Sequence, residues 1–212
     1  MKLVAEVTEF IAAHPQYACW AIFFLALSEA IPIVGTVVPG STLVVAISAL
    51  ATRANIAPWL LLVAATMGAI IGDGLSYWLG QRYHQEILHR WPINQFPQLV
   101  VRSEAFFSRY GSASVFLARF TAVVRAFVPL IAGILRMPAR QFYAANILSA
   151  VIWAPAHVFP GVMLAIVASL AGASAEQLLI LVVAAMILGW ALFQVVRLAF
   201  KRGILSWPAS PK

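Results

Sequence analysis

Four ionisable side chains lie inside otherwise apolar stretches of this sequence, namely Glu29, Asp73, Arg119 and Arg125. An ionisable group at membrane depth costs roughly 2.5–3.5 kcal/mol on insertion scales, and such a group is by default a candidate for function. A guanidinium group binds phosphate through two parallel hydrogen bonds and stays charged when it is desolvated. A buried carboxylate can take up and release a proton. Together the four residues predict an interior site for a phosphate group, linked to proton exchange.

The same four side chains allow a second interpretation. Two carboxylates and two arginines can neutralise one another in buried ion pairs that only hold segments of the chain together. The two interpretations are compatible, and the sequence leaves both open. It also leaves open whether Glu29 or Asp73 exchanges a proton near neutral pH, because desolvation and a neighbouring arginine act in opposite directions.

The spacing of these residues indicates what must position them. Arg119 and Arg125 are six residues apart, so on one straight helix they point in different directions. A chain reversal between them brings both guanidinium groups to one anion. Asp73 and Tyr77, four residues apart, share a helix face. Beside that face, small residues at every fourth position allow another backbone to approach, either within the chain or in a dimer. They are Gly68, Gly72, Ser76 and Gly80.

The composition excludes a soluble globular protein. Of 212 residues, 63% are hydrophobic and 10% are charged, whereas soluble domains have about 45–50% and 25%. The net charge of +7 is therefore expected in loops beside anionic lipid headgroups rather than on a nucleic-acid surface. The single Cys19 allows neither an internal disulfide nor a thiolate metal site. The chain has no metal, nucleotide or nucleophile motif, so we expect no enzyme and no cofactor.

Spanning a bilayer takes about twenty mostly apolar residues, and the chain has five long apolar regions plus one bend-rich segment. They are residues 10–30, 31–51, 58–80, 113–135, 142–172 and 178–200. Arginines in the loop 81–112 and the basic tail after residue 196 predict that both lie in the cytoplasm, and we expect both termini there.

If residues 10–30 cross outward from the cytoplasm and residues 58–80 cross back, this orientation requires two regions to enter and leave on the same side. Residues 31–51 and 113–135 are interrupted by proline and glycine, which is typical of broken helices at membrane depth. We therefore expect a single all-α polytopic membrane domain over residues 1–212, with about four transmembrane helices and two opposed re-entrant hairpins in an inverted repeat. Six plain kinked helices are the alternative. Pro155 and Pro160 leave region 142–172 as either one kinked helix or two segments.

Two further features carry weaker signals. His157 is either a proton relay or a hydrogen-bonded core residue. The end of the basic loop, from Ser103, is expected to form an amphipathic surface helix.

Three motifs resemble the successive signatures of the DedA family of bacterial inner-membrane proteins. They are Glu29 with AIPIVGTVVPGSTLVV (30–45), GDGLSYWLG (72–80) and ARFTAVVRAFVPLIAGILRMPARQFYAANILSAVIWA (118–154). That family shares its core, the VTT domain, also known as the SNARE-associated Golgi protein domain, with eukaryotic lipid scramblases. The resemblance covers about residues 25–165 and leaves the C-terminal helix 178–200 outside the core.

The resemblance implies a translocase for undecaprenyl phosphate or a phospholipid, driven in several members by the proton motive force. It implies required residues at Glu29, Asp73, Arg119 and Arg125. Two departures put the substrate in doubt. The family often has proline three residues after the first arginine, whereas residues 121–123 of this chain read TAV. The family also often has an acidic residue after the PG turn, where this chain has Ser41.

We therefore expect a flippase or scramblase for a phosphate-bearing lipid, with undecaprenyl phosphate as the first choice, in the bacterial inner membrane. The expected phosphate ligands are Arg119 and Arg125 with the turn residues Pro39, Gly40, Ser41 and Thr42. The expected proton-coupling residues are Glu29 and Asp73, supported by Tyr77.

Other functions remain open at this point: a proton-coupled transporter of small ions or drugs, a general phospholipid scramblase, an enzyme acting on lipid phosphates, and an assembly scaffold. The expected partners are membrane lipids, protons and a second copy of the chain. The lipid, the direction of transport, the coupling ion and the oligomeric state do not follow from the sequence.

Overall fold

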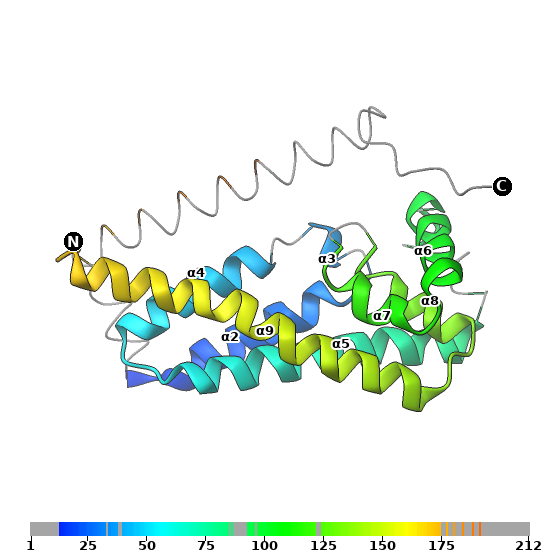
Figure 1. Cartoon of the computed structure of the whole chain (residues 1–212), viewed down its shortest axis with the longest axis horizontal. Coiled ribbons are helices and arrows are strands. Elements are labelled where there is room, and N and C mark those ends of the chain that lie inside the picture. Colours follow the sequence, from blue (N-terminus) through cyan, green and yellow to red (C-terminus); the bar gives the residue numbers. More distant parts are fainter. Residues whose placement is uncertain are drawn as a thin grey trace.

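The computed structural model describes residues 13–32, 34–37, 40–84, 86, 93–95, 97–121 and 124–174, with single positions at 177, 180, 184, 188 and 191. Within these residues all regular structure is helical, as expected (Figure 1). The helices are α2 (Pro15–Glu29), α3 (Val34–Val37), α4 (Gly40–Arg53), α5 (Pro58–Tyr83), α6 (Pro97–Tyr110), α7 (Ala113–Ala118), α8 (Val128–Ile134) and α9 (Ala139–Leu170), with a 3-10 turn at Ile93–Gln95. Pro39 and most of the expected helix 178–200 lie outside the described residues.

Two of the described helices, α5 and α9, are long and apolar enough to cross a membrane, with 26 and 32 residues. At about 1.5 Å per residue each exceeds the hydrocarbon thickness of about 30 Å. The helix α9 continues through Pro155 and Pro160, so the region that the sequence left undecided is one helix. In Figure 1 the two long helices lie side by side and run in opposite directions.

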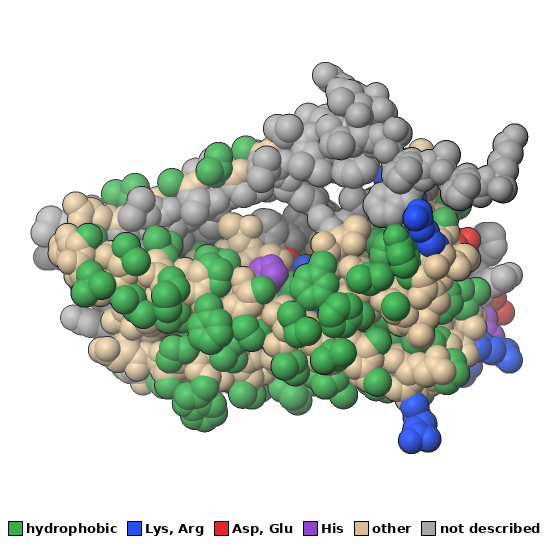
Figure 2. All heavy atoms as spheres, in the orientation of Figure 1, with side chains coloured by type: hydrophobic (Ala, Val, Ile, Leu, Met, Phe, Trp, Pro, Cys, Tyr) green, Lys and Arg blue, Asp and Glu red, His purple; other side chains and the backbone are tan. Residues whose placement is uncertain are grey.

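The helix α5 carries its large and its small side chains on opposite faces. Val63, Met67 and Ile71 are exposed, whereas Gly68 and Gly72 are buried. A helix in a water-soluble protein shows the reverse pattern, with large apolar residues facing the core. The surface in Figure 2 is accordingly hydrophobic over its broad middle region. This distribution is the one expected where the surrounding solvent is lipid.

The buried small residues of α5 bring α2 and α8 close. Gly68 lies against the carbonyl oxygen of Phe23, and Ser76 Oγ donates a hydrogen bond of 2.8 Å to the carbonyl of Ala30. The partners increase in the same order, so α2 and α5 run parallel. Gly80 lies against the backbone of α8. The stripe therefore serves packing within the chain, one of the two uses that the sequence left open.

The turns that precede the two long helices have the same geometry. Asn55 and Arg136 both have positive φ, 59° and 55°. In each turn the following N–H donates to a carbonyl five residues earlier, Ile56 to Ala51 at 3.0 Å and Met137 to Ala132 at 2.9 Å. The helix before each turn packs on the long helix of the other half, α4 on α9 and α8 on α5. Each long helix thus follows a turn of the same geometry and packs on the helix that precedes the other turn.

The first expected hairpin differs from the structure in its bounds. Within 31–51 the first limb is only α3, with 4 residues, whereas α4 has 14. The helix that packs along α4 is α2, so the two-limbed unit consists of α2 and α4. Breakers at Pro32, Gly35 and Gly40 leave no room for a longer limb between them. The second expected region, 113–135, does divide into two limbs, α7 and α8.

Apart from Arg53 and the interior Arg119 and Arg125, the described arginines lie at one end of the molecule, where Figure 2 shows most of the blue side chains. They are Arg82, Arg102, Arg109, Arg136 and Arg140. Arg53 lies at the other end, where its Nη2 donates to the carbonyl of Ala173 at 3.0 Å. Because α2 is parallel to α5, it begins at the Arg53 end. A segment 10–30 that crosses outward from the basic end is therefore wrong in its direction.

The amphipathic surface helix begins earlier than expected. It starts at Pro97, and Ser103 lies in its middle with its side chain buried. Val100 and Phe106 are buried beside Ser103, whereas Val101 and Arg102 are exposed. Proline is favourable in the first turn of a helix, because backbone N–H groups there have no acceptor within the helix.

Candidate functional site

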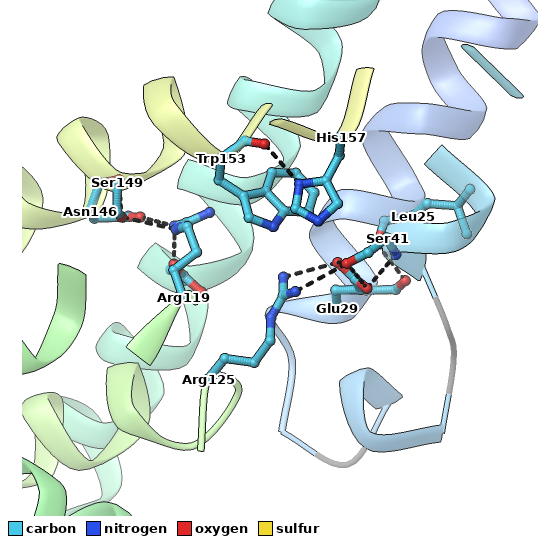
Figure 3. Close-up of polar contacts among 11 residues, drawn as sticks. Leu25, Glu29, Ser41, Arg119, Arg125, Asn146, Ser149, Trp153 and His157 are labelled. Carbon is cyan, nitrogen blue, oxygen red and sulfur yellow. Dashed lines mark hydrogen bonds and ion pairs between the residues drawn. The ribbon is translucent and has the colours of Figure 1, made fainter. Parts of the chain in front are cut away.

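The structure brings the four charged residues together as two interior ion pairs, Arg119 with Asp73 and Arg125 with Glu29. Glu29 is the last residue of α2, and Asp73 lies in the middle of α5. Both arginines lie between α7 and α8, at the reversal expected between them. They pair with two different carboxylates, so the guanidinium groups do not share one partner (Figure 3).

The guanidinium group of Arg119 is held by polar side chains of α5 and α9. Its Nη2 donates to Asp73 Oδ2 and, at 2.5 Å, to Asn146 Oδ1, and its Nε donates to Ser149 Oγ at 2.9 Å. Its side chain is 3% exposed. Asn146 in turn donates through Nδ2 to the carbonyl of Ile70 at 3.1 Å, which ties α9 to α5. A buried charge with this many partners is fixed in position.

The pair of Arg125 and Glu29 is the more open of the two. Arg125 Nη2 lies 2.9 Å from Glu29 Oε2, and the side chain of Arg125 is 14% exposed. Arg125 Nη1 also donates to Ser41 Oγ at 3.3 Å. These contacts join three elements, the end of α2, the start of α4 and the reversal between α7 and α8.

The Glu29 carboxylate occupies the donors at the first turn of α4. The backbone N–H of Ser41 donates to Glu29 Oε1 at 2.5 Å, and Ser41 Oγ donates to the same oxygen at 2.8 Å. Gly40 makes this approach possible, because a Cβ there would lie 2.5 Å from Glu29 Cγ. A helix N-terminus with an arginine beside it is an anion-binding arrangement. In this structure the bound anion is the protein's own carboxylate.

This geometry places the other predicted site residues. The turn N–H groups expected for a ligand are in part engaged by Glu29, through Ser41. Thr42 is half-buried on α4, and Pro39 lies outside the described residues. Tyr77 is not in contact with the ion pairs in any described interaction: its hydroxyl donates to the carbonyl of Met137 at 2.5 Å, and its ring stacks on another aromatic ring. It holds α5 to the turn before α9.

Sequence reasoning named only His157 on the face of α9 that lines both ion pairs and missed Asn146, Ser149 and Trp153. Asn146, Ser149, Trp153 and His157 follow one another at intervals of three or four residues, and Figure 3 shows all four on the side of the arginines. The guanidinium carbon of Arg125 lies 5.4 Å from the centre of the Trp153 ring. The signal was polar residues at helical spacing in an apolar segment, which indicates a buried polar contact.

His157 is a hydrogen-bonded residue in this site. Its Nδ1 donates to the carbonyl of Trp153 at 2.8 Å, and its ring stacks on Trp153 with centres 4.4 Å apart. Since a carbonyl only accepts, Nδ1 carries a proton and is the donor in this hydrogen bond. In Figure 2 the middle of the hydrophobic face has a hollow with a histidine side chain and small areas of acidic and basic colour.

Comparison with known proteins assigns this chain to a family. The VTT domain matches residues 38–163, a range that contains Asp73, both arginines and the α9 face. The chain belongs to the VTT domain family. Glu29 lies before the matched range. The DedA resemblance of the sequence motifs is confirmed by relatives with that name.

Three relatives show the extent of the similarity. The chain is similar to inner membrane protein YabI of Escherichia coli K12, with 29% identity over 160 residues, 75% of this chain and 63% of the relative. Protein DedA of the same strain is 26% identical over 164 residues, 76% of this chain and 75% of DedA. An uncharacterized membrane protein of Synechocystis, slr0232, is 35% identical over 142 residues, 66% and 63% of the two chains.

The chain thus spans under two thirds of the length of YabI. No solved structure matches it. YabI, slr0232 and a further relative from Buchnera aphidicola are named as membrane proteins, which supports the membrane location of this VTT domain protein.

Proposed function

We propose that this protein is a translocase that moves a phosphate-bearing lipid, with undecaprenyl phosphate as the preferred substrate, between the leaflets of the bacterial inner membrane. The observation that carries the proposal is the anion site at the start of α4. There Arg125, the Ser41 N–H and the Ser41 hydroxyl converge on the Glu29 carboxylate inside an apolar-surfaced molecule. A phosphate oxygen uses the same donors as a carboxylate oxygen.

The proposal includes a membrane arrangement. The helices α5 and α9 cross the bilayer, residues 178–200 form a further span, and the pairs α2 with α4 and α7 with α8 enter from opposite sides as re-entrant hairpins. The matched turns before α5 and α9 support this inverted repeat. The arginine-rich end faces the cytoplasm, because short cytoplasmic loops carry an excess of basic residues. The tail after residue 196 then lies in the cytoplasm as well.

Competition between Glu29 and the headgroup supplies a mechanism. A proton on Glu29 removes the negative charge that holds Arg125 and weakens its hold on the Ser41 N–H. Arg125 and the first turn of α4 then bind the phosphate, and loss of the proton restores the ion pair and releases the lipid. Proton uptake and lipid binding are thereby linked. The lipid tail stays in the bilayer, so the protein needs to shield only the headgroup.

Arg119 has a different role in this mechanism. Asp73, Asn146 and Ser149 hold its guanidinium group in place. It therefore contributes a fixed positive charge and anchors the reversal that carries Arg125. We propose that it contacts the phosphate during passage, with Asp73 as the carboxylate that neutralises it when the site is empty of lipid.

Transport of labelled undecaprenyl phosphate by the purified chain in proteoliposomes tests the proposal. Arg119→Lys is expected to slow transport at least about tenfold, because a single ammonium cannot reproduce the fork of hydrogen bonds. Arg125→Gln, which removes the more open charge, is expected to do the same. The matched control is Arg102→Gln, at an exposed position on α6, with unchanged transport expected.

The outcomes separate the rival functions. Wild-type rates in both Arg119→Lys and Arg125→Gln would contradict the proposed mechanism. Equal movement of phosphatidyl lipids would indicate a general phospholipid scramblase. Flux of a soluble ion or drug without lipid movement would indicate a proton-coupled transporter. Release of phosphate from a polyprenyl diphosphate would indicate an enzyme.

A further inference from the structure

The indole N–H of Trp153 has no acceptor in the part of the chain that the structure describes. Trp153 is 1% exposed, and its Nε1 is a buried atom without a hydrogen-bond partner. An indole nitrogen can only donate, and leaving a buried donor unpaired is costly, so buried tryptophans usually find a partner. Two serine hydroxyls share this condition, at Ser48 and Ser114. A hydroxyl can rotate toward a nearby acceptor, whereas an indole N–H is fixed with its ring.

The ring of Trp153 packs against two other side chains of the site. His157 stacks on it with an angle of 28° between the planes, and its Nδ1 donates to the Trp153 carbonyl. The Arg125 guanidinium carbon lies 5.4 Å from the ring centre. The N–H therefore cannot turn toward a protein acceptor without breaking the stack. Its direction is a fixed feature of the site.

The N–H faces the ion pairs. In Figure 3 the indole nitrogen of Trp153 lies on the edge of its ring that is turned toward Arg125, between the two arginines. Along α9, Ser149 precedes Trp153 by one turn and already binds Arg119. The unpaired donor thus lies next to the guanidinium group that the proposed function assigns to the phosphate.

We propose that Trp153 is a binding residue for the phosphate monoester group, whose oxygen accepts the indole N–H while Arg125 holds the same group. This inference rests on the proposed function and deepens it. Arg125 supplies charge, the first turn of α4 supplies a backbone donor, and Trp153 supplies a fixed neutral donor from the opposite helix. A phosphate monoester has enough oxygens to accept from all three, whereas the two oxygens of Glu29 are already occupied by Ser41 and Arg125.

His157 acts through Trp153 as a positioning residue. Its ring covers one face of the indole, and its bond to the Trp153 carbonyl fixes both side chains on α9. The second ring nitrogen of His157 lies on the same side as the indole nitrogen (Figure 3). No proton transfer by His157 is needed for the binding that we propose.

Nuclear magnetic resonance of the indole groups tests the inference. The chain has 7 tryptophans, so the ¹⁵N-labelled protein in maltoside detergent, which carries no phosphate, gives a small set of indole signals. The Trp153 signal is the one absent from Trp153→Phe. If that variant does not fold, the six single Trp→Phe variants at the other positions assign the signal by elimination.

Three probes separate the headgroup from the tail. Undecaprenyl phosphate is expected to move the Trp153 indole proton downfield, as a new hydrogen bond to an anion does. Undecaprenol, which has the same tail without phosphate, is expected to leave it unchanged. Inorganic phosphate at high concentration is expected to produce the same shift if the site recognises the phosphate itself, and no shift if it requires the lipid. An equal shift with undecaprenol would overturn the inference, because the tail would then be the cause.

Affinity gives an independent readout. Trp153→Phe keeps an aromatic ring against Arg125 and His157 but removes the donor, so binding of undecaprenyl phosphate is expected to weaken about tenfold. Trp78→Phe, at a 54% exposed position on α5, is the control and is expected to bind as the wild type does. If Trp153→Phe binds with wild-type affinity and the indole signal does not move, while Arg125→Gln loses binding, the role of Trp153 is overturned and the proposed function stands. Absence of lipid phosphate binding in the wild type would instead contradict the proposed function.

Discussion

Replacing Glu29 by Gln is expected to weaken the folded protein and strengthen lipid binding at the same time. The glutamate accepts from the Ser41 N–H, the Ser41 hydroxyl and Arg125. Glutamine keeps one oxygen for the Ser41 N–H but removes the charge that holds Arg125. The substitution therefore takes away the internal anion and leaves the donors for an external one.

The magnitudes follow from the burial of the pair. Breaking a fully buried ion pair costs about 3–5 kcal/mol. The Arg125 side chain is 14% exposed and Ser41 Oγ still faces it, so a smaller loss of about 2 kcal/mol is expected. A bond to a charged group is worth about 1.5–3 kcal/mol, so removing the competitor should raise the affinity for a lipid phosphate by about one to two orders of magnitude.

Thermal unfolding of the purified protein, with and without undecaprenyl phosphate, measures both effects. Without lipid, Glu29→Gln should unfold roughly 4–8 °C lower than the wild type. With lipid at about a hundredfold excess over its dissociation constant, the variant should regain about 2.7 kcal/mol. The control is Glu104→Gln on α6, the same chemical change away from the site, for which neither effect is expected.

The opposite signs make the result decisive. Lower stability with unchanged or weaker lipid binding would refute the competition mechanism and would leave Glu29 as a purely structural partner of Arg125. Unchanged stability would show that the ion pair does not hold α2, α4 and the reversal between α7 and α8 together.

Two further changes test the packing. Gly80→Ala should lower the free energy of unfolding by about 1–3 kcal/mol, because its Cβ would collide with the backbone of α8. Gly74→Ala is the control, because its new Cβ meets only the end of Tyr143 at 3.4 Å. Equal or higher stability is expected for this control in the same denaturation experiment. Arg136→Gly should raise the melting temperature slightly, because glycine adopts the positive φ of 55° without strain. The expected gain in the free energy of unfolding is about 0.5–1 kcal/mol. A lower melting temperature would mean that the contact of Arg136 with His84 outweighs the strain.

The amino-acid sequence alone indicates a membrane protein and identifies the ionisable residues in its apolar segments. The excess of apolar residues indicates lipid as the solvent whatever the fold. Glu29, Asp73, Arg119 and Arg125 stand out because an ionisable group in an apolar segment is expensive in any arrangement. The reversal between the two arginines also followed from their spacing, because a straight helix cannot bring side chains six positions apart to one side.

Local sequence was less informative about the ends of elements. Pro155 and Pro160 looked able to divide α9, yet the helix continues through both. In a packed helix, neighbouring segments compensate for the missing N–H groups. The direction of α2 was wrong in the prediction because it depends on which helix α2 packs against. That partner is α5, through contacts such as Gly68 with Phe23.

The pairing of the charges was decided by the tertiary structure alone. Nothing in the sequence assigns Arg119 to Asp73 and Arg125 to Glu29, because that choice depends on the register between helices that are far apart in the chain. The same register places Ser41 under the Glu29 carboxylate and turns Trp153 toward Arg125. Composition and spacing select the residues that can do chemistry, whereas close backbone contacts between helices decide which of them meet.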